Sequence, residues 1–318
     1  MRSIEICAGA GGQALGLERA GFDHIDLVEH DAPACATLRV NRPNWNVIHA
    51  DVHAYSAEHL RGIELLAGGV PCPPFSHAGK QLGASDERDL FPQALRLVDE
   101  CRPLAVMLEN VRGLLDASFS EYRGGVLETL TKLGYQAEWR LLHASDFGVS
   151  QLRPRSILVG LKKSMSHHFS WPTPHAIRPP SVGELLHDLM KSGGWHGADA
   201  WRAQANGIAP TLVGGSKKHG GPDLGPTRAR TAWAALGVDG RSLADEPPAV
   251  DLIGMPRLTV RMAARVQGFP DTWNLVGKKT PAYRQVGNAF PPPVAHAVGR
   301  QIAAAFEAAA NARVARRA

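Results

Sequence analysis

Hydrophobic and polar positions follow two different periods along the first 160 residues of the chain. Short apolar runs predict buried strands over residues 3–6, 25–28, 47–48, 63–67, 104–108 and 157–161. Helical spacing predicts helices between them, over residues 14–19, 32–41, 90–101 and 121–133. Strands that alternate with helices are typical of an α/β fold with a doubly wound, mostly parallel sheet. Because ligands of such sheets bind beyond the carboxyl ends of the strands, the residues that follow each apolar run are the first candidates for a site.

The pattern changes after Pro172. Residues 166–256 contain 10 of the 23 prolines and 13 of the 33 glycines, and they show no sustained period. This composition predicts a loop-rich insert or small domain rather than more of the sheet. Helical spacing returns over residues 260–266 and 294–310. We therefore predict a main domain formed by residues 1–175 and 260–318, and a smaller domain formed by residues 176–259.

The composition of the 318 residues, with 44% hydrophobic and 20% charged, is typical of a globular protein with a sizeable core. No apolar run approaches the roughly 20 residues that span a bilayer, and no cationic leader precedes the first strand. We therefore expect a cytoplasmic protein with no membrane partner. A net charge of +5 permits a nucleic-acid partner without requiring one.

The four cysteines lie far apart and form no C-x-x-C pair, so the sequence predicts neither a metal site nor a disulfide framework. Scattered cysteines usually serve as small buried apolar side chains, and Cys35 and Cys101 fit that interpretation. Cys72 does not fit it, because it lies among prolines in GVPCPPFS, where no ordinary helix or strand can continue.

A glycine-rich turn, ICAGAGG, follows the first predicted strand. Its spacing differs from the G-x-G-x-x-G fingerprint of dinucleotide-binding proteins, which disfavours a Rossmann dehydrogenase. Glu29 and Asp51 follow the next two strands. A carboxylate at Glu29 can accept hydrogen bonds from both ribose hydroxyls, and Asp51 can accept one from an adenine amino group. This pattern fits a nucleoside cofactor without a diphosphate, and plain loop carboxylates are the alternative interpretation.

A thiol, a carboxyl group and two cations are expected near the same edge of the sheet. Cys72 follows the fourth predicted strand, and Glu109 follows the next one in LENV. Arg153 and Arg155 lie two positions apart in QLRPR, so on an extended backbone both project from the same face. This set suits attack by a thiolate on an electron-poor ring, with Glu109 at a ring nitrogen. Nearby arginines would help to ionise the thiol, whose ordinary pKa is about 8.5.

Eight motifs occur in a fixed order along the chain: ICAGAGG, VEHD, ADV, GVPCPPFS, LENV, QLRPR, RLTVRMAARVQGFP and YRQVGNAFPPPV. Each is a modest signal alone, but the ordered set with a variable insert between the sixth and seventh is very specific. On these motifs the chain resembles the bacterial C5-cytosine-specific DNA methyltransferases, and the resemblance covers nearly everything outside residues 170–255.

The resemblance implies a Rossmann-like sheet of the S-adenosylmethionine-dependent methyltransferases, with helices on both faces, and a smaller loop-rich target-recognition domain. It implies transfer of a methyl group from S-adenosyl-L-methionine, which leaves S-adenosyl-L-homocysteine, to C5 of a flipped-out cytosine in a short duplex DNA sequence. Cys72 would form a covalent adduct at C6, and Glu109 would hydrogen-bond and protonate N3. The catalytic set implied is Cys72, Glu109, Arg153 and Arg155.

The resemblance also implies binding residues. The expected cofactor-binding residues are Cys7, Ala8, Gly9, Gly11, Gly12, Glu29, His30, Asp51, Val52, Pro71, Leu90 and Asn288. Among them the glycines would shape the methionine pocket, and the Pro71 carbonyl would contact the flipped cytosine. The expected DNA-binding residues are Ser76, Lys80, Gln81, Gln151, Thr211, Lys217, Lys218, Arg228 and Arg230. Residues 76–88 would form a loop that closes over DNA.

The chain departs from the family pattern at three positions. Cys7 stands where a phenylalanine usually packs on the adenine, and His30 stands where an aromatic residue often covers it. Met262 occupies a position that is often acidic. None of these departures changes Cys72 or Glu109.

Expected partners follow from the same resemblance. We expect a monomer that acts on double-stranded DNA in the bacterial cytoplasm, associated with the nucleoid through DNA. A restriction–modification role would pair it with a cognate endonuclease that acts on the same site without a stable complex. Acidic and basic residues balance across residues 166–256, eight of each, so a neutral surface insert also remains open.

Two alternative functions remain open. A tRNA cytosine-C5 methyltransferase would share PC and ENV, but it usually carries a Cys-Phe-Thr segment that this chain lacks. A catalytically silent DNA-binding relative would be expected to have lost Cys72 or Glu109, and both are present. The target sequence is not predicted.

Overall fold

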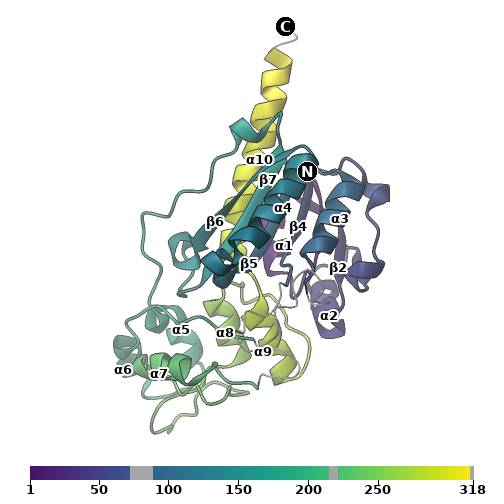
Figure 1. Ribbon diagram of the computed structural model, residues 1–318. Helices are drawn as coiled ribbons and strands as arrows, with labels where there is room; N and C mark the ends of the chain where they lie inside the picture. Colours follow the sequence, from purple (N-terminus) through teal and green to yellow (C-terminus); the bar gives the residue numbers. More distant parts are fainter. Residues whose placement is uncertain (72–88, 215–220, 316–318) are drawn as a thin grey trace.

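The protein is built on a seven-stranded sheet with the strand order β3-β2-β1-β4-β5-β7-β6 (Figure 1). A computed structural model describes residues 1–71, 89–214 and 221–315. The strands are β1 Arg2–Ile6, β2 Asp23–Glu29, β3 Val47–His49, β4 Leu65–Gly68, β5 Ala105–Val111, β6 Tyr135–His143 and β7 Pro154–Lys162. The first five strands pair in parallel, and β7 runs antiparallel to both β5 and β6. The expectation of a mostly parallel sheet is confirmed.

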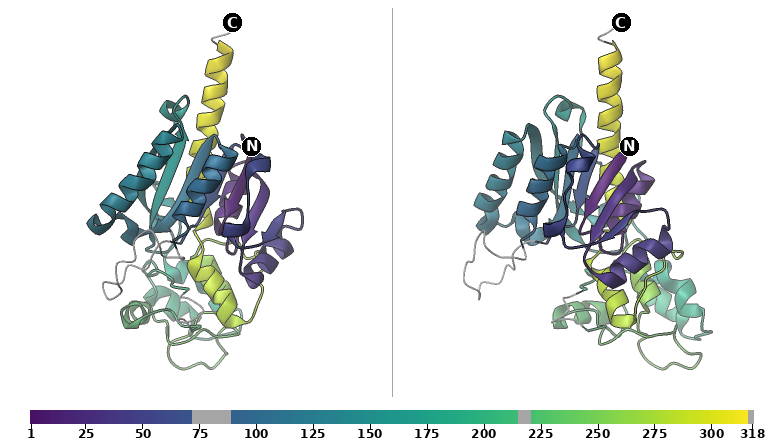
Figure 2. Two further views of the ribbon diagram at one scale, coloured as in Figure 1. Left: turned by 45° about the vertical axis from the view of Figure 1, so that its right-hand side comes forward. Right: turned by 90° about the vertical axis from the view of Figure 1, so that its right-hand side faces the viewer.

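Helices cover both faces of the sheet (Figures 1 and 2). One apolar layer joins α1 Gly12–Arg19 and α10 Pro292–Ala315 to the sheet, and another joins α3 Phe91–Cys101 and α4 Ser120–Lys132. Strand β5 shows why both faces need cover: Ala105 and Met107 belong to the first layer, whereas Val106 and Leu108 belong to the second. Helix α2, Ala32–Asn41, lies beside β2 and β3.

The insert contains more helix than the sequence predicted. Its helices are α5 Val182–Lys191, α6 Ala198–Gln204 and α7 Thr227–Ala235, and α8 Val260–Val266 and α9 Lys279–Asn288 follow it. These helices lie beneath the sheet in Figure 1. Three buried tryptophans, Trp195, Trp201 and Trp233, belong to the apolar cluster that also contains Trp45 and Trp273 of the main body. Because this core is continuous, the boundaries at residues 176 and 259 stay a prediction.

Short 3-10 helices connect the larger elements, at Val52–Ala54, Glu58–Leu60, Arg112–Leu115, Ala117–Phe119, Ala144–Phe147 and Ser166–His168. The sequence interpretation overlooked β6, α9 and the insert helices. Strand β6 lies at the edge of the sheet and alternates partly buried with exposed residues, so it carries no continuous apolar run. Within the described ranges, no helix is long and apolar enough to cross a membrane.

Candidate active site

The loop after β1 is shaped by residues with a left-handed backbone. Cys7, Gly9 and Gly11 have φ angles of 52°, 54° and 81°. Glycine adopts such angles without the steric cost that a Cβ brings, so it suits the tight turn into α1. Among the residues that the structure describes, a Cβ at Gly9 would meet no heavy atom within 4 Å, which leaves space beside the loop. The turn can therefore bring its backbone close to a ligand.

Residues from the far end of the chain brace this glycine loop. The Trp273 indole Nε1 donates a hydrogen bond of 3.0 Å to the Ala10 carbonyl. A Cβ at Gly12 would lie 2.3 Å from the Phe290 carbonyl oxygen, so only glycine allows the two segments to approach. Sequence reasoning missed Trp273, and its only signal was a place three residues after the motif RLTVRMAARVQGFP, which ends at Pro270.

The Glu29 carboxylate fastens the end of β2 to the glycine loop. It accepts hydrogen bonds from the backbone N–H groups of Gly9 at 2.8 Å and Asp31 at 2.7 Å, and His30 Nδ1 lies 3.1 Å away. Burial works to raise the pKa of Glu29, but these hydrogen bonds outweigh it and hold the pKa below its usual range. The group is therefore an anionic acceptor at the mouth of the loop.

The remaining expected adenosine contacts lie on the same side of the loop. Asp51 is exposed and accepts hydrogen bonds from the backbone N–H and the ring Nδ1 of His53, at 2.9 and 2.7 Å. Val52 is buried behind it. Burial, with help from the carboxylates of Glu29 and Asp51, raises the pKa of the Cys7 thiol. This thiol therefore stays neutral and presents an apolar surface.

These residues fit a nucleoside cofactor. The open space at Gly9, the carboxylate of Glu29 and the exposed Asp51 supply a cradle and two acceptors in the arrangement expected for a ribose and an adenine. Ala8 is buried, and its N–H donates to the Val28 carbonyl at 3.2 Å. Asn288 is exposed at the end of α9.

Glu109 is a buried acid at the end of β5. Arg155 Nε lies 2.8 Å from Glu109 Oε1, and both side chains are about nine-tenths buried. Burial raises the pKa of Glu109, and the guanidinium groups of Arg155 and Arg153 oppose that shift without cancelling it. A Cβ at Gly69 would lie 3.4 Å from Glu109 Oε2 and 3.9 Å from the Cys7 carbonyl oxygen. The acid, the end of β4 and the glycine loop therefore meet at one place.

The segment that leads to Cys72 is tied to the same place. Asn110 Nδ2 donates to the Val70 carbonyl at 2.7 Å, and the Leu90 N–H donates to the Pro71 carbonyl at 3.1 Å. Asn110 belongs to the LENV motif, but no role was predicted for it. Cys72 follows Pro71 directly and lies outside the described residues, as do the expected DNA-binding residues Ser76, Lys80, Gln81, Lys217 and Lys218.

Arg153 and Gln151 lie at a buried junction between β7 and later parts of the chain. Both side chains are completely buried. Arg153 donates to the carbonyls of Leu212 at 2.8 Å, Gly287 at 2.8 Å and Ala289 at 3.0 Å. Gln151 accepts from the Leu212 N–H at 2.9 Å, so it contributes to the same junction, and its contact with DNA stays a prediction. An electrostatic effect of Arg153 on the Cys72 thiol stays a prediction.

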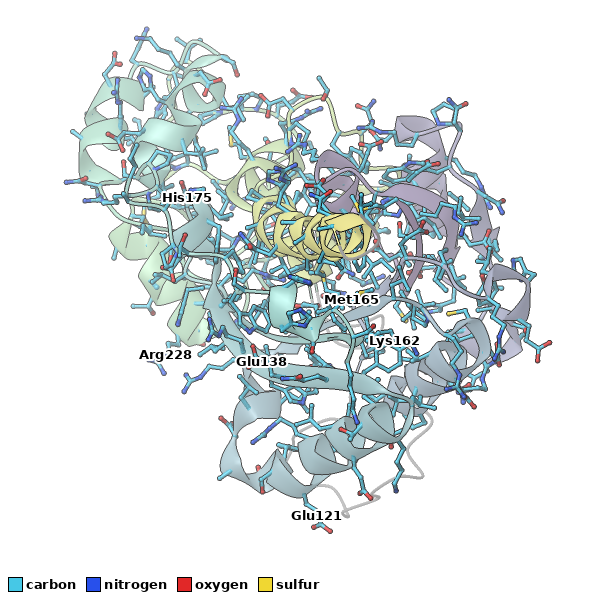
Figure 3. The ribbon with its side chains drawn as sticks, turned by 90° about the horizontal axis from the view of Figure 1, so that it is seen from above. Glu121, Glu138, Lys162, Met165, His175 and Arg228 are labelled. Carbon is cyan, nitrogen blue, oxygen red and sulfur yellow. The ribbon has the colours of Figure 1, made fainter. Side chains whose placement is uncertain are left out.

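The other expected DNA contacts lie on the insert. The Thr211 hydroxyl donates to the Leu152 carbonyl, which ties the insert to the start of β7. Arg228 is exposed, and Figure 3 shows it at the periphery of the molecule, on α7. Arg230 is partly buried and donates from Nη2 to the Thr227 hydroxyl at 3.3 Å. Their contact with DNA stays a prediction.

The family model for C-5 cytosine-specific DNA methylases matches residues 1–304. The type II methyltransferase M.NgoMIV of Neisseria gonorrhoeae is 56% identical over 314 residues, which are 96% of this chain and 98% of that protein. The type II methyltransferase M.NaeI of Lentzea aerocolonigenes is 60% identical over 311 residues, which are 95% of this chain and 75% of that protein.

Two solved structures share the fold. A DNA modification methyltransferase encoded within an E. coli prophage has a TM-score of 0.69 at 24% identity, over 96% of this chain and 99% of that one. Spodoptera frugiperda DNMT2 has a TM-score of 0.65 at 16% identity, over 96% of this chain and 99% of that one. The sheet with helices on both faces is therefore confirmed as the fold of this group. With the family match over nearly the whole chain and relatives above 50% identity, this chain belongs to the C-5 cytosine-specific DNA methylase family.

Proposed function

We propose that the chain transfers a methyl group from S-adenosyl-L-methionine to C5 of cytosine at a short sequence in duplex DNA, as the modification enzyme of a restriction–modification system. The observation that carries this proposal is the position of Glu109. It is a buried acid paired with Arg155 at the point where β4, β5 and the glycine loop meet, beside the segment that leads to Cys72.

The proposed reaction begins with attack of the Cys72 thiolate on C6 of the cytosine. The target base must first leave the stack, at a cost of a few kcal/mol, because C5 and C6 cannot be reached within the duplex. As the S–C6 bond forms, Glu109 donates its proton to N3, and the electron pair of the C5=C6 bond becomes available at C5. A raised pKa suits this step, because it keeps the carboxyl group protonated at a higher pH than an ordinary glutamic acid.

When bound, S-adenosyl-L-methionine supplies the methyl group that C5 accepts, and S-adenosyl-L-homocysteine remains. Loss of the C5 proton to a base then restores the C5=C6 bond and expels the Cys72 thiolate, while the N3 proton returns to Glu109. Glu29 and the glycine loop would hold the ribose and methionine parts of the cofactor, and Asp51 and Val52 would hold the adenine. Arg155 orients the Glu109 carboxyl group toward the base.

The test of this function is methyl transfer from radiolabelled S-adenosylmethionine to unmodified duplex DNA, followed by bisulfite sequencing of the product. Label at cytosines of one short motif is the expected result. Incorporation into tRNA but not into DNA would replace the proposal with the RNA methyltransferase. No incorporation into either, with the cofactor bound, would identify a silent relative.

Cys72→Ser provides the control for the covalent step. We expect this variant to lose methyl transfer while it binds the cofactor nearly as well as the wild type, because a serine hydroxyl is a far weaker nucleophile than a thiolate. Equilibrium dialysis with labelled cofactor checks binding. Retained methyl transfer, or lost cofactor binding, would contradict the role of Cys72.

The setting of the reaction is proposed on the same basis. We infer that the enzyme works as a monomer in the bacterial cytoplasm, bound to the nucleoid through DNA. A cognate endonuclease would cleave the same sequence without forming a stable complex with it. Size-exclusion chromatography with light scattering checks the oligomeric state of the purified chain.

A further inference from the structure

One carboxylate of the insert holds two arginines that sequence reasoning did not assign. Asp239, which lies four residues after α7, has a nearly buried side chain. Arg241 and Arg257 both pair with it, yet 76% and 48% of their side-chain surfaces remain exposed. We call Arg241 and Arg257, held on Asp239, the arginine platform.

The hydrogen bonds of the platform fix the direction of both guanidinium groups. Arg241 makes a two-pronged contact, with Nε 2.9 Å from Asp239 Oδ1 and Nη2 3.1 Å from Oδ2. Arg257 Nε lies 3.1 Å from the same Oδ2. The hydrogen bonds from Arg241 have the largest influence on the pKa of Asp239 and lower it. Burial acts in the opposite direction, but the pKa of Asp239 still lies well below its usual range. Asp239 is therefore an anion across the neutral pH range.

The backbone of the platform is braced as well. The Asp239 N–H donates to the Pro256 carbonyl at 2.9 Å, next to Arg257, and the Arg241 N–H donates to Asp239 Oδ1 at 3.1 Å. The Ala244 N–H donates to the Leu258 carbonyl at 2.9 Å. Two chain segments that are far apart in sequence thus carry the two arginines as one rigid unit.

The segments around the platform pack against helix α7. Val213 lies 3.6 Å from the position of a Cβ at Gly225, and the Ala229 Cβ of α7 lies 3.4 Å from the same position. Gly240 is the residue between Asp239 and Arg241. A Cβ at Gly240 would lie within 3.4 Å of the Cα and Cγ of Arg230. The platform therefore adjoins Arg230, one of the two α7 arginines expected at the DNA.

The donors that remain on each guanidinium match one edge of a base. Asp239 occupies the Nε and Nη2 edge of Arg241, which leaves the end formed by Nη1 and the second hydrogen of Nη2 pointing outward. Two parallel donors at that end suit the paired acceptors O6 and N7 that guanine presents in the major groove. A backbone phosphate also offers paired oxygens to an arginine, but such a contact carries no sequence information.

We propose that Asp239 positions Arg241 and Arg257 to read guanine in the major groove of the target duplex. The proposal rests on the proposed function and adds the residues that select the sequence. A carboxylate between two arginines lowers the net charge of the patch from +2 to +1, which weakens phosphate attraction. It also keeps the donors aligned, as readout of the two guanine acceptors requires. Guanine readout is therefore favoured over phosphate contact.

The experiment maps target preference with a library of duplexes of randomised sequence. Each variant methylates the library with S-adenosylmethionine, and bisulfite sequencing of the product gives the preferred base at every position. Arg241→Lys and Arg257→Lys keep the charge but lose the two-pronged donor edge, and Asp239→Asn keeps the shape but weakens the anchor. Arg102→Lys is the matched control, because Arg102 also pairs with an aspartate, Asp99, but lies at the end of α3 and outside the insert.

The wild-type enzyme and Arg102→Lys should yield the same short motif. Arg241→Lys and Arg257→Lys should each relax a G·C position of that motif, by about 5- to 150-fold in preference. Asp239→Asn should relax the same positions to a smaller extent, which a merely structural effect on stability would not produce. Thermal denaturation checks that the variants fold. If Asp239→Asn does not fold, Arg241→Lys decides the matter, because the Arg241 side chain is mostly exposed and its replacement should not disturb the fold.

An unchanged motif in both lysine variants would overturn the proposal. A changed salt dependence of DNA binding with an unchanged motif would assign the arginines to phosphate instead, and would overturn it equally. A wild-type enzyme that methylates no DNA refutes the proposed function itself, which distinguishes the two failures.

Discussion

At the scale of single residues, the protonation of Glu109 is set by two opposing influences. Burial at the end of β5 raises its pKa, while the neighbouring guanidinium groups of Arg155 and Arg153 act to lower it. The net shift is upward. A larger fraction of this side chain is therefore protonated at neutral pH than in an exposed glutamic acid, as a proton donor requires.

Replacement of Glu109 by glutamine tests the proton transfer. The amide in Glu109→Gln can still donate a hydrogen bond to N3, but it has no acidic proton to give. We expect kcat to fall by about 10²- to 10⁴-fold, with cofactor binding retained. Single-turnover methyl transfer and thermal denaturation measure the two effects. Turnover close to that of the wild type would remove Glu109 from the mechanism.

The pH dependence of turnover gives a second test at this scale. Because the protonated form of Glu109 donates the proton, kcat should fall as the pH rises through its raised pKa. The thiolate of Cys72 acts in the opposite direction and should make kcat rise with pH at the acidic end. A pH–rate profile should therefore be bell-shaped, and the residual activity of Glu109→Gln should lack the alkaline fall. An alkaline fall that persists in the variant would point to another group.

The position of a residue could be predicted from the sequence when local patterns determine it, but not when its hydrogen-bond partners lie far away along the chain. Glu29 and Glu109 each follow an apolar run, and the carboxyl ends of parallel strands lie along one edge of a sheet, so their placement at that edge was predictable. The contacts of Arg153 were not, because its acceptors lie 59, 134 and 136 positions away. No local pattern shows which backbone carbonyls will reach a given guanidinium.

At the scale of elements, helices α1 and α10 pack so closely that their contact requires glycine. A Cβ at Gly16 would lie 2.4 Å from the Pro292 carbonyl oxygen and 2.5 Å from the Ala295 Cβ. Real Cβ contacts do not reach these distances, so one of the two helices would have to move. By contrast, a Cβ at Gly124 in α4 would meet no heavy atom within 4 Å.

The pair Gly16→Ala and Gly124→Ala should therefore change stability in opposite directions. Alanine is favoured over glycine in a helix interior by about 0.8–1 kcal/mol, so Gly124→Ala should raise the free energy of unfolding by up to roughly that amount. Gly16→Ala should lower it by about 1–3 kcal/mol, because overpacking outweighs the helix preference. Urea denaturation measures both. A Gly16→Ala variant as stable as the wild type would show that the helices can separate freely.

The elements of the insert were overlooked for different reasons. Helix α5 had a readable signal, since Val182, Leu186 and Met190 follow the helical period after the capping box of Ser181 and Glu184. Treating all of residues 166–256 as loop obscured it. Helix α7 had none, because Trp233 is its only buried residue, so only its tertiary setting determines that it is helical.

At the scale of the whole molecule, the Gln151 and Arg153 side chains join three regions that are distant in sequence. Their hydrogen bonds connect the start of β7 to Leu212 of the insert, to Gln267 after α8 and to the end of α9. A Cβ at Gly287 would lie 2.2 Å from the Gly214 nitrogen, so the insert and α9 also touch backbone to backbone. The insert is thus fixed to the start of β7, to the segment after α8 and to the end of α9.

Arg153→Lys should weaken this junction. An ammonium group cannot reach all three carbonyls that the guanidinium serves, and buried carbonyls left without donors are costly. We expect the free energy of unfolding to fall by about 2–4 kcal/mol. Urea denaturation measures the loss, with the exposed Arg61→Lys as a control that should change it little. If stability is unchanged but methyl transfer at a low temperature is lost, Arg153 acts in catalysis rather than in the junction.

The close contact of Gly12 with Phe290 also bears on how the protein is made. These residues are 278 positions apart (290 − 12), which a ribosome takes on the order of 15–60 s to cover. During that time the helix that follows the glycine loop has no α10 to pack against, and the loop lacks the brace from Trp273. A half-made chain therefore cannot offer a finished cradle for the methyl donor. Each copy of the enzyme would therefore become able to modify DNA only after helix α10 has left the ribosome.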